Sequence, residues 1–133
     1  MLKNSIYIIL FHFFTNFTLS QSQSFNYKGT IGSVPTEMTM VVSVSKDGCI
    51  FTFDGTYFNK RLKKELEIKT TLNPCKNEKE NPDEKITLLE YNNDTISGSF
   101  QLKGIGEYNC SGNWISKNGK RKTPARFTLK KEN

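Results

Sequence analysis

From residue 25 onward, hydrophobic and polar residues alternate in short runs that glycine, asparagine and aspartate interrupt. Successive side chains of a strand point to opposite faces, so this period-two pattern predicts strands with one buried face. Short strands separated by frequent turn signals are typical of a sandwich or a barrel. We predict eight strands, at residues 25–31, 37–45, 49–58, 62–72, 85–91, 95–102, 107–115 and 123–130.

The segment 62–72 has two interpretations. Leu62, Leu66 and Lys69 would also suit one face of a helix. From Leu66 onward, however, every second residue to position 72 shares one face, and Thr70 and Thr71 are β-branched. Both features favour a strand.

Eight strands joined by mostly short connections pair with their chain neighbours and can close on themselves, which removes exposed edges. The predicted fold is therefore all-β: an eight-stranded antiparallel up-and-down barrel or a closely related β-sandwich. A barrel of this size is just wide enough to be filled by side chains or to hold one small ligand.

A glycine and an aromatic residue recur two positions apart on one strand face. The four pairs are Tyr27-x-Gly29, Gly55-x-Tyr57, Gly98-x-Phe100 and Gly112-x-Trp114. Glycine lets a strand bend, and a neighbouring ring can cover the gap that it leaves. The rings either shape and fill the barrel or line a ligand pocket, and the sequence leaves both interpretations open.

The first twenty residues have the anatomy of a secretory signal peptide. Lys3 is followed by an apolar run at 6–14 and by the small-residue cleavage pattern Thr18-Leu-Ser20. His12 and Asn16 interrupt the apolar stretch, which is too short for a bilayer-spanning helix. We predict cleavage after Ser20, with Ser22 and Ser24 as alternative positions. The processed chain is then a single β-barrel domain at 21–133 with no transmembrane segment, in a secreted or periplasmic protein.

Histidine chemistry is excluded from the processed chain, because the only histidine, His12, lies in the predicted signal peptide. This removes Ser-His and Cys-His nucleophiles and histidine metal sites. Cys49, Cys75 and Cys110 lack the spacing of a zinc site. We expect no metal and no cofactor.

In an oxidising compartment two of the three cysteines should pair. Cys75 lies in a long loop that could reach a neighbouring strand, whereas Cys49 and Cys110 fall on predicted strands three and seven, across the barrel. Because pairing needs Cα atoms within about 7 Å, we predict a disulfide between Cys75 and Cys110 and a buried thiol at Cys49.

Alternate turns of an up-and-down barrel lie at opposite ends. One end collects a basic rim, formed by Lys60, Arg61, Lys63, Lys117, Lys120, Arg121 and Lys122. Just below it the pattern places the candidate ligand-binding residues Tyr57, Lys64, Glu90 and Trp114. Without Lys3 the chain carries 18 basic and 13 acidic residues, a balance that serves solubility and tolerates an anionic partner.

Glu90 should point inward near the rim, where a carboxylate needs a partner or water. Lys64 is the nearest cation that the pattern offers, and Glu90 is either a paired structural residue or a ligand contact. Glycosidase chemistry needs two carboxylates across a cleft, but Asp54, Glu65 and Glu67 alternate outward. We therefore expect a protein that is not an enzyme.

Two functional hypotheses remain. The first is a binding module whose basic, aromatic mouth takes a small or anionic ligand, with an anionic glycan, a lipid head group or a protein as partner. The second is a protein–protein interaction module, such as an exported hydrolase inhibitor or a component of a surface assembly. Export disfavours nucleic acid as a partner, and we expect a monomer.

A family resemblance accompanies these residues. The segments that carry it, in order, are Tyr27-Lys-Gly-Thr-Ile, Gly55-Thr-Tyr-Phe, Ile86-Thr-Leu-Leu-Glu90, Gly98-Ser-Phe and Gly112-Asn-Trp. Their succession resembles small exported bacterial β-proteins of unknown function. Gly55-Thr-Tyr57 and the strand count are also similar, more weakly, to the avidin and lipocalin class. The resemblance implies a bacterial source and a barrel fold, and no activity.

Overall fold

The computed structural model describes residues 21–131 and is all-β. The predicted signal peptide, residues 1–20, lies outside the described residues. The strands are β1 Gln21–Ile31, β2 Val34–Val44, β3 Phe51–Asn59, β4 Lys64–Leu72, β5 Ile86–Asn92, β6 Thr95–Lys103, β7 Asn109–Ser116 and β8 Lys122–Leu129. All eight predicted strands are present, and the segment that could have been helical is strand β4.

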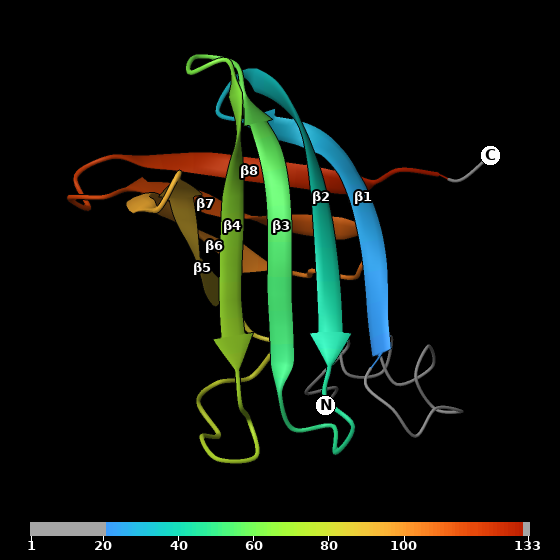
Figure 1. The fold of residues 1–133 in the computed structure, drawn as a ribbon. Helices are drawn as coiled ribbons and strands as arrows, with labels where there is room; N and C mark the ends of the chain where they lie inside the picture. The colour runs from blue at the N-terminus through green and yellow to red at the C-terminus, as the bar shows by residue number, and fades with distance from the viewer. Residues whose placement is uncertain (1–20, 132–133) are drawn as a thin grey trace.

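Each strand pairs antiparallel with its chain neighbours, and β8 pairs with β1 to close an up-and-down barrel. The predicted fold class is therefore confirmed in its barrel form. Figure 1 shows β1–β4 side by side at the front, with β7 and β8 crossing behind them, so the barrel is flattened. Strand β4 joins β5 through only three residue pairs, the shortest ladder of the barrel.

The barrel interior is filled by alternating side chains of all eight strands. Met38, Met40 and Val42 of β2 point inward, as do Phe51 and Phe53 of β3, and all five are buried. Close packing of such side chains supplies the main stabilisation, about 1.5–3 kcal/mol for each fully buried large residue. Three rings of the glycine-aromatic pairs, Tyr27, Tyr57 and Phe100, belong to this core.

One end of the barrel is closed. It carries the β2–β3 turn (45–50), the β4–β5 loop (73–85) and the β6–β7 turn (104–108). Ile105 is buried there, and the Tyr27 hydroxyl donates to the Glu107 carbonyl and accepts from the Gly106 amide, each at 2.8 Å. Burial raises the pKa of Tyr27 above its ordinary value. These contacts tie the β6–β7 turn to the core.

The predicted disulfide was wrong. Cys75 pairs with Cys49, with Cα atoms 5.3 Å apart, and Cys110 is a buried free thiol. Cys49 lies in the β2–β3 turn and not on β3, so it sits beside the β4–β5 loop that carries Cys75. Cys110 lies opposite Phe127 of β8 in the strand register, and its side chain faces the core, where a surface loop cannot reach it.

Candidate functional site

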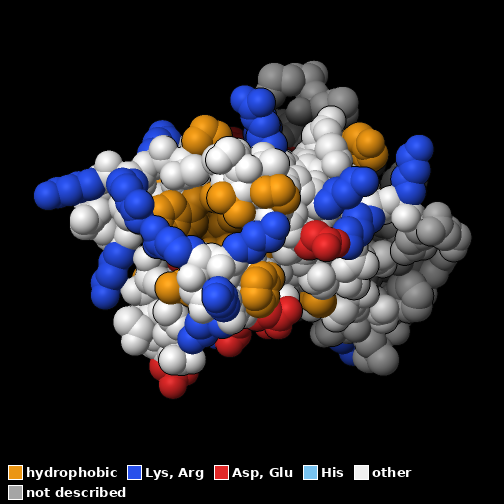
Figure 2. Space-filling view, turned by 90° about the horizontal axis from the view of Figure 1, so that it is seen from above, with side chains coloured by type: hydrophobic (Ala, Val, Ile, Leu, Met, Phe, Trp, Pro, Cys, Tyr) orange, Lys and Arg blue, Asp and Glu red, His pale blue; other side chains and the backbone are white. Residues whose placement is uncertain are grey.

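The other end of the barrel is open, and we call it the mouth. It consists of the turns at 32–33, 60–63, 93–94 and 117–121. A hollow of about 210 Å³ opens there, lined by Ile31, Val34, Thr36, Tyr57, Phe58, Asn59, Lys60, Arg61, Trp114, Arg121 and Thr123. Figure 2 shows this end from above, with hydrophobic side chains in the hollow and lysine and arginine side chains around it.

Trp114 and Arg121 form one wall of the hollow. The Arg121 guanidinium lies 5.5 Å from the centre of the Trp114 ring, a cation–π distance. Trp114 is on β7 opposite Thr123 of β8, so the β7–β8 hairpin brings the ring and the cation together. A planar cation stacked on a half-buried ring is held in place, which prepares it to bind an anion.

Beneath the hollow lies Glu90, which is only 2% exposed. Its Oε2 accepts hydrogen bonds from the Tyr57 hydroxyl and, at 3.1 Å, from Trp114 Nε1. Its Oε1 accepts a hydrogen bond from the Ser97 hydroxyl at 2.8 Å. Three donors thus surround a carboxylate that has no room for water, and they compensate for its burial.

The hydroxyl of Tyr57 is both part of this network and part of the hollow's lining. Burial raises the pKa of Tyr57 above its ordinary value, and the hydrogen bond to Glu90 and its negative charge raise the pKa further. The positive charge of Arg61 acts in the opposite direction.

Gly98 makes room for the indole of Trp114. It lies opposite Glu90 on β5 and opposite Ser116 on β7. A Cβ at this position would come within 3.0 Å of Trp114 Nε1 and 2.9 Å of the Ile115 carbonyl oxygen. Trp114 of β7 therefore covers the glycine of a different sequence pair, Gly98-x-Phe100 on β6, and also reaches the buried carboxylate.

Lys64 does not pair with Glu90. The β4–β5 register places Ile68 opposite Glu90, so Lys64 lies four residues nearer the rim, about 13 Å along the strand. Its Nζ donates to Asn92 Oδ1 at 2.6 Å and to Asn93 Oδ1 at 3.4 Å. Lys64 thus links β4 to the end of β5 at the rim, where the two strands share no backbone ladder. It is not among the residues that line the hollow.

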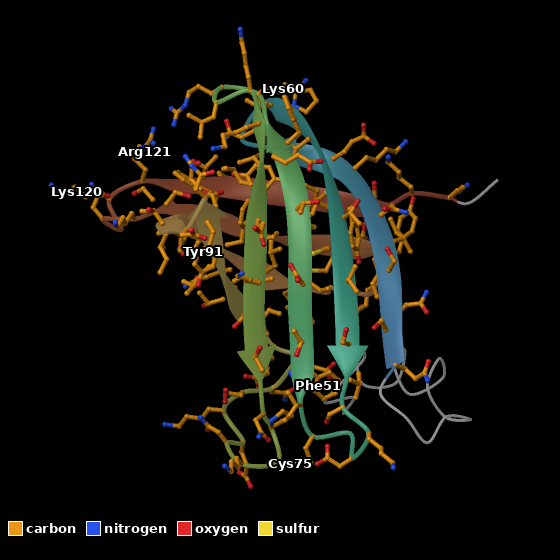
Figure 3. The ribbon with its side chains drawn as sticks, viewed as in Figure 1. Phe51, Lys60, Cys75, Tyr91, Lys120 and Arg121 are labelled. Carbon is orange, nitrogen blue, oxygen red and sulfur yellow. A yellow bond between two sulfur atoms is a disulfide. The ribbon has the colours of Figure 1, made fainter. Side chains whose placement is uncertain are left out.

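The basic rim gathers at the mouth, as the up-and-down order requires. Lys60, Arg61 and Arg121 line the hollow, whereas Lys63, Lys117, Lys120 and Lys122 are exposed around it. Figure 3 shows Lys60 on the uppermost turn and Lys120 and Arg121 on the β7–β8 turn. Among residues 21–131, no ion pair joins the three lining cations to a carboxylate.

Several residues of the site carried no clear sequence signal. Ser97 reaches Glu90 because the β5–β6 register shifts between Glu90 and Tyr91. Phe58 lies on the outer face of β3, yet contributes to the hollow at the strand's end. A register shift and the bend of a strand end depend on the neighbouring strands, so neither is visible in one strand's pattern.

The described residues offer little support for a catalytic carboxylate pair or a metal site. Asp54, Glu65 and Glu67 are exposed on the outer face, as their alternation predicted. Within residues 21–131, no group of three metal-binding side chains comes together. The same part of the chain contains no helix long and apolar enough to cross a membrane.

Comparisons with protein-family models, with curated proteins and with solved structures find no match to this chain.

Proposed function

We propose that this protein is an exported, non-catalytic binding protein whose barrel mouth holds a small anionic ligand. The observation that carries the proposal is the hollow itself: an apolar, aromatic recess at the open end of a filled barrel, bordered by Lys60, Arg61 and Arg121. Most ligand pockets are similarly apolar, with a few polar groups that fix orientation.

The ligand should combine an anionic group with a compact apolar or aromatic body. Arginine offers paired donors that match a carboxylate, sulfonate or phosphate, and Arg121 is already oriented by Trp114. The volume of about 210 Å³ is below the 300–1,000 Å³ of drug-sized pockets. The mouth therefore suits a small molecule or one end of a larger one.

Export is supported by the sequence of residues 1–20 and by the Cys49–Cys75 disulfide, since structural disulfides persist in oxidising compartments. A non-catalytic role is supported by the position of Glu90. Its carboxylate accepts hydrogen bonds from Tyr57, Ser97 and Trp114, is buried, and is not among the groups that line the hollow.

The probe for this proposal is 8-anilinonaphthalene-1-sulfonate, an aromatic sulfonate, compared with the uncharged N-phenyl-1-naphthylamine. Trp114 is the only tryptophan and lines the hollow, so its fluorescence reports directly on occupancy. We expect saturable quenching by the sulfonate and weaker quenching by the neutral probe.

The variant Arg121→Gln should weaken sulfonate binding about tenfold, because it removes a charge-assisted hydrogen bond. Lys76→Gln, in the loop at the closed end, is the matched control and should bind like the wild type. Equal affinity of Arg121→Gln and wild type, or equal affinity for the two probes, would contradict the proposal.

A second candidate function is protein–protein interaction through the β4–β5 loop, as in a hydrolase inhibitor or a surface assembly. The loop is ordered by the disulfide, by Asn73 and Asn81 turns, and by burial of Pro82 and Asp83 against the barrel. An ordered loop loses little entropy on binding. Replacing residues 76–80 with a Gly-Ser linker should abolish such an activity and leave sulfonate binding intact.

A further inference from the structure

Exposed apolar side chains gather at the mouth. Val34, Phe58 and Leu62 are 44%, 47% and 44% exposed, and they belong to the start of β2, the end of β3 and the β3–β4 turn. The Leu62 amide donates to Asn59 Oδ1 at 2.9 Å, so the turn that presents its side chain is held by a hydrogen bond. Leu62 does not line the hollow, so the exposure of its side chain is not explained by the proposed ligand site.

Cations flank Leu62, whereas Phe58 lies opposite Glu65 of β4 and lines a surface hollow together with Glu37 of β2. The four mouth turns contain Lys60, Arg61, Lys63, Lys117, Lys120 and Arg121, against the single carboxylate of Asp94. Leu62 is flanked in sequence by Arg61 and Lys63. In Figure 2 this end presents lysine and arginine side chains at its margin and hydrophobic ones between them.

We propose that the mouth end docks onto the surface of an anionic lipid bilayer. Leu62 enters the boundary between head groups and acyl chains, and the lysines of the β3–β4 and β7–β8 turns contact the lipid phosphates. This inference goes beyond ligand binding in the hollow, because it needs no occupant there. It also differs from membrane insertion, because the barrel stays outside the bilayer.

Two features favour a bilayer over other polyanions. A glycan or a nucleic acid backbone offers charge without an apolar layer, and it would leave Leu62 in water. An anionic bilayer offers both, and binding strength there grows with buried apolar area and with each cation near the surface. The charge of the mouth turns is also complementary to such a surface.

The test is co-sedimentation of the full chain with vesicles of phosphatidylcholine alone or with phosphatidylglycerol added. We expect binding only to the anionic vesicles. Binding should weaken at high salt, because the Debye screening length falls from roughly 10 Å at 0.1 M salt to 3 Å at 1 M. All variants are compared in the same chain, so any contribution from residues 1–20 is common to all of them.

Two variants separate the apolar and the charged contributions. Leu62→Ser should reduce partitioning about tenfold through lost apolar burial. Lys117→Glu with Lys120→Glu should reduce it at least about thirtyfold, since each lost cation contributes about 1 kcal/mol near an anionic surface and each new carboxylate is repelled by it. These side chains do not line the hollow, so sulfonate binding should be retained and should separate this inference from the proposed function.

Matched controls come from the closed end. Ile50→Ser removes an exposed apolar side chain, and Lys76→Glu with Lys79→Glu reverses two lysines of the β4–β5 loop. Both should partition like the wild type. Equal binding to neutral and anionic vesicles would overturn the inference. It would also be overturned if Leu62→Ser bound anionic vesicles as tightly as the wild type, because the surface would then be a general polyanion site.

Discussion

Glu90 is the residue around which the mouth is organised. Its carboxylate is buried beneath the hollow, and Tyr57 and Trp114, which donate to it, also line the hollow. A buried carboxylate without partners would be strongly destabilising, so the donors must stay close to it. The same hydrogen bonds therefore hold the two rings that form the floor and one wall of the site.

Replacing this carboxylate with an amide should destabilise the fold. In Glu90→Gln one acceptor oxygen becomes an NH₂ group that faces a donor, and we expect a loss of about 2 kcal/mol in the free energy of unfolding. Urea denaturation followed by Trp114 fluorescence measures it. Glu65→Gln, at an exposed position on β4, is the control and should change stability by less than about 0.5 kcal/mol. Similar midpoints for the two variants would refute this role of Glu90.

The buried thiol of Cys110 predicts how stability depends on alkaline pH. Burial raises its pKa from 9.0 to about 12 in the folded protein. Between these values the unfolded chain loses the proton and the folded chain keeps it, so stability falls as pH rises above 9. We expect a loss of about 1.4 kcal/mol by pH 10 from this group, about one pH unit beyond the unfolded pKa.

The measurement is urea unfolding at pH 8 and at pH 10 for the wild type and for Cys110→Ala. The variant should be less stable at pH 8 but should lose less stability between the two pH values. Tyr57 is common to both proteins, and its raised pKa adds the same decline at higher pH. Cys110 contributes to the raised pKa of Tyr27, so the decline due to Tyr27 should be smaller in the variant. Parallel declines in the two proteins would show that the thiol titrates normally.

At the scale of the strands, the β4–β5 junction is the weakest part of the barrel wall. Its ladder has three residue pairs, from Glu67 to Lys69 on β4. Lys64 bridges the rim side through a hydrogen bond to Asn92, which supplements the few backbone hydrogen bonds between β4 and β5. At the closed end, the Cys49–Cys75 disulfide ties the β4–β5 loop to the β2–β3 turn.

The disulfide should therefore be identifiable and should stabilise the protein. Peptide mapping without reduction should recover Cys49 joined to Cys75 and Cys110 unlinked. Cross-linking residues 26 apart should contribute about 3.5 kcal/mol by restricting the unfolded chain, and Cys49→Ser with Cys75→Ser should lose that amount. A peptide that links Cys110 to either partner would contradict the arrangement, because Cys110 faces the core.

At the scale of the whole molecule, the chain has two different ends. One end is filled by side chains that include Ile105, and its loops are joined by the disulfide. The other end contains the hollow, which aromatic and cationic side chains line. An even number of antiparallel strands gives this division, since alternate turns fall at opposite ends. The functional proposals follow from it, because the mouth combines an apolar, aromatic recess with the cations Lys60, Arg61 and Arg121.

The processed protein should begin at or shortly after Gln21. The apolar run at 6–14 followed by Thr18-Leu-Ser20 has the pattern of a signal for export and cleavage. Intact mass of the protein recovered outside the cytoplasm is expected to match residues 21–133 or a start a few residues later. A full-length mass found in the membrane fraction would contradict this prediction and the proposed export.

Predictions from the sequence succeeded for properties that depend on the residues of a single strand. The alternation of Met38, Met40 and Val42, or of Leu66 and Ile68, is enough to assign a strand and its buried face. The predicted bounds of the strands differ from the observed ones by a few residues. Strand β1, for example, begins at Gln21, before its predicted start. Pairing with β2 extends β1 beyond the alternating segment, and the residues of β1 alone do not indicate it.

The sequence by itself determined that the chain forms eight antiparallel strands, that basic turns share one end, and that Glu90 faces inward. These properties follow from the period of side chains along a strand and from the parity of the turns. Only the tertiary structure decided that Cys49 meets Cys75, that Glu90 is held by Tyr57, Ser97 and Trp114, and that the interior is filled while its mouth is hollow. Those outcomes depend on register, barrel flattening and loop position, which bring together residues far apart in the chain.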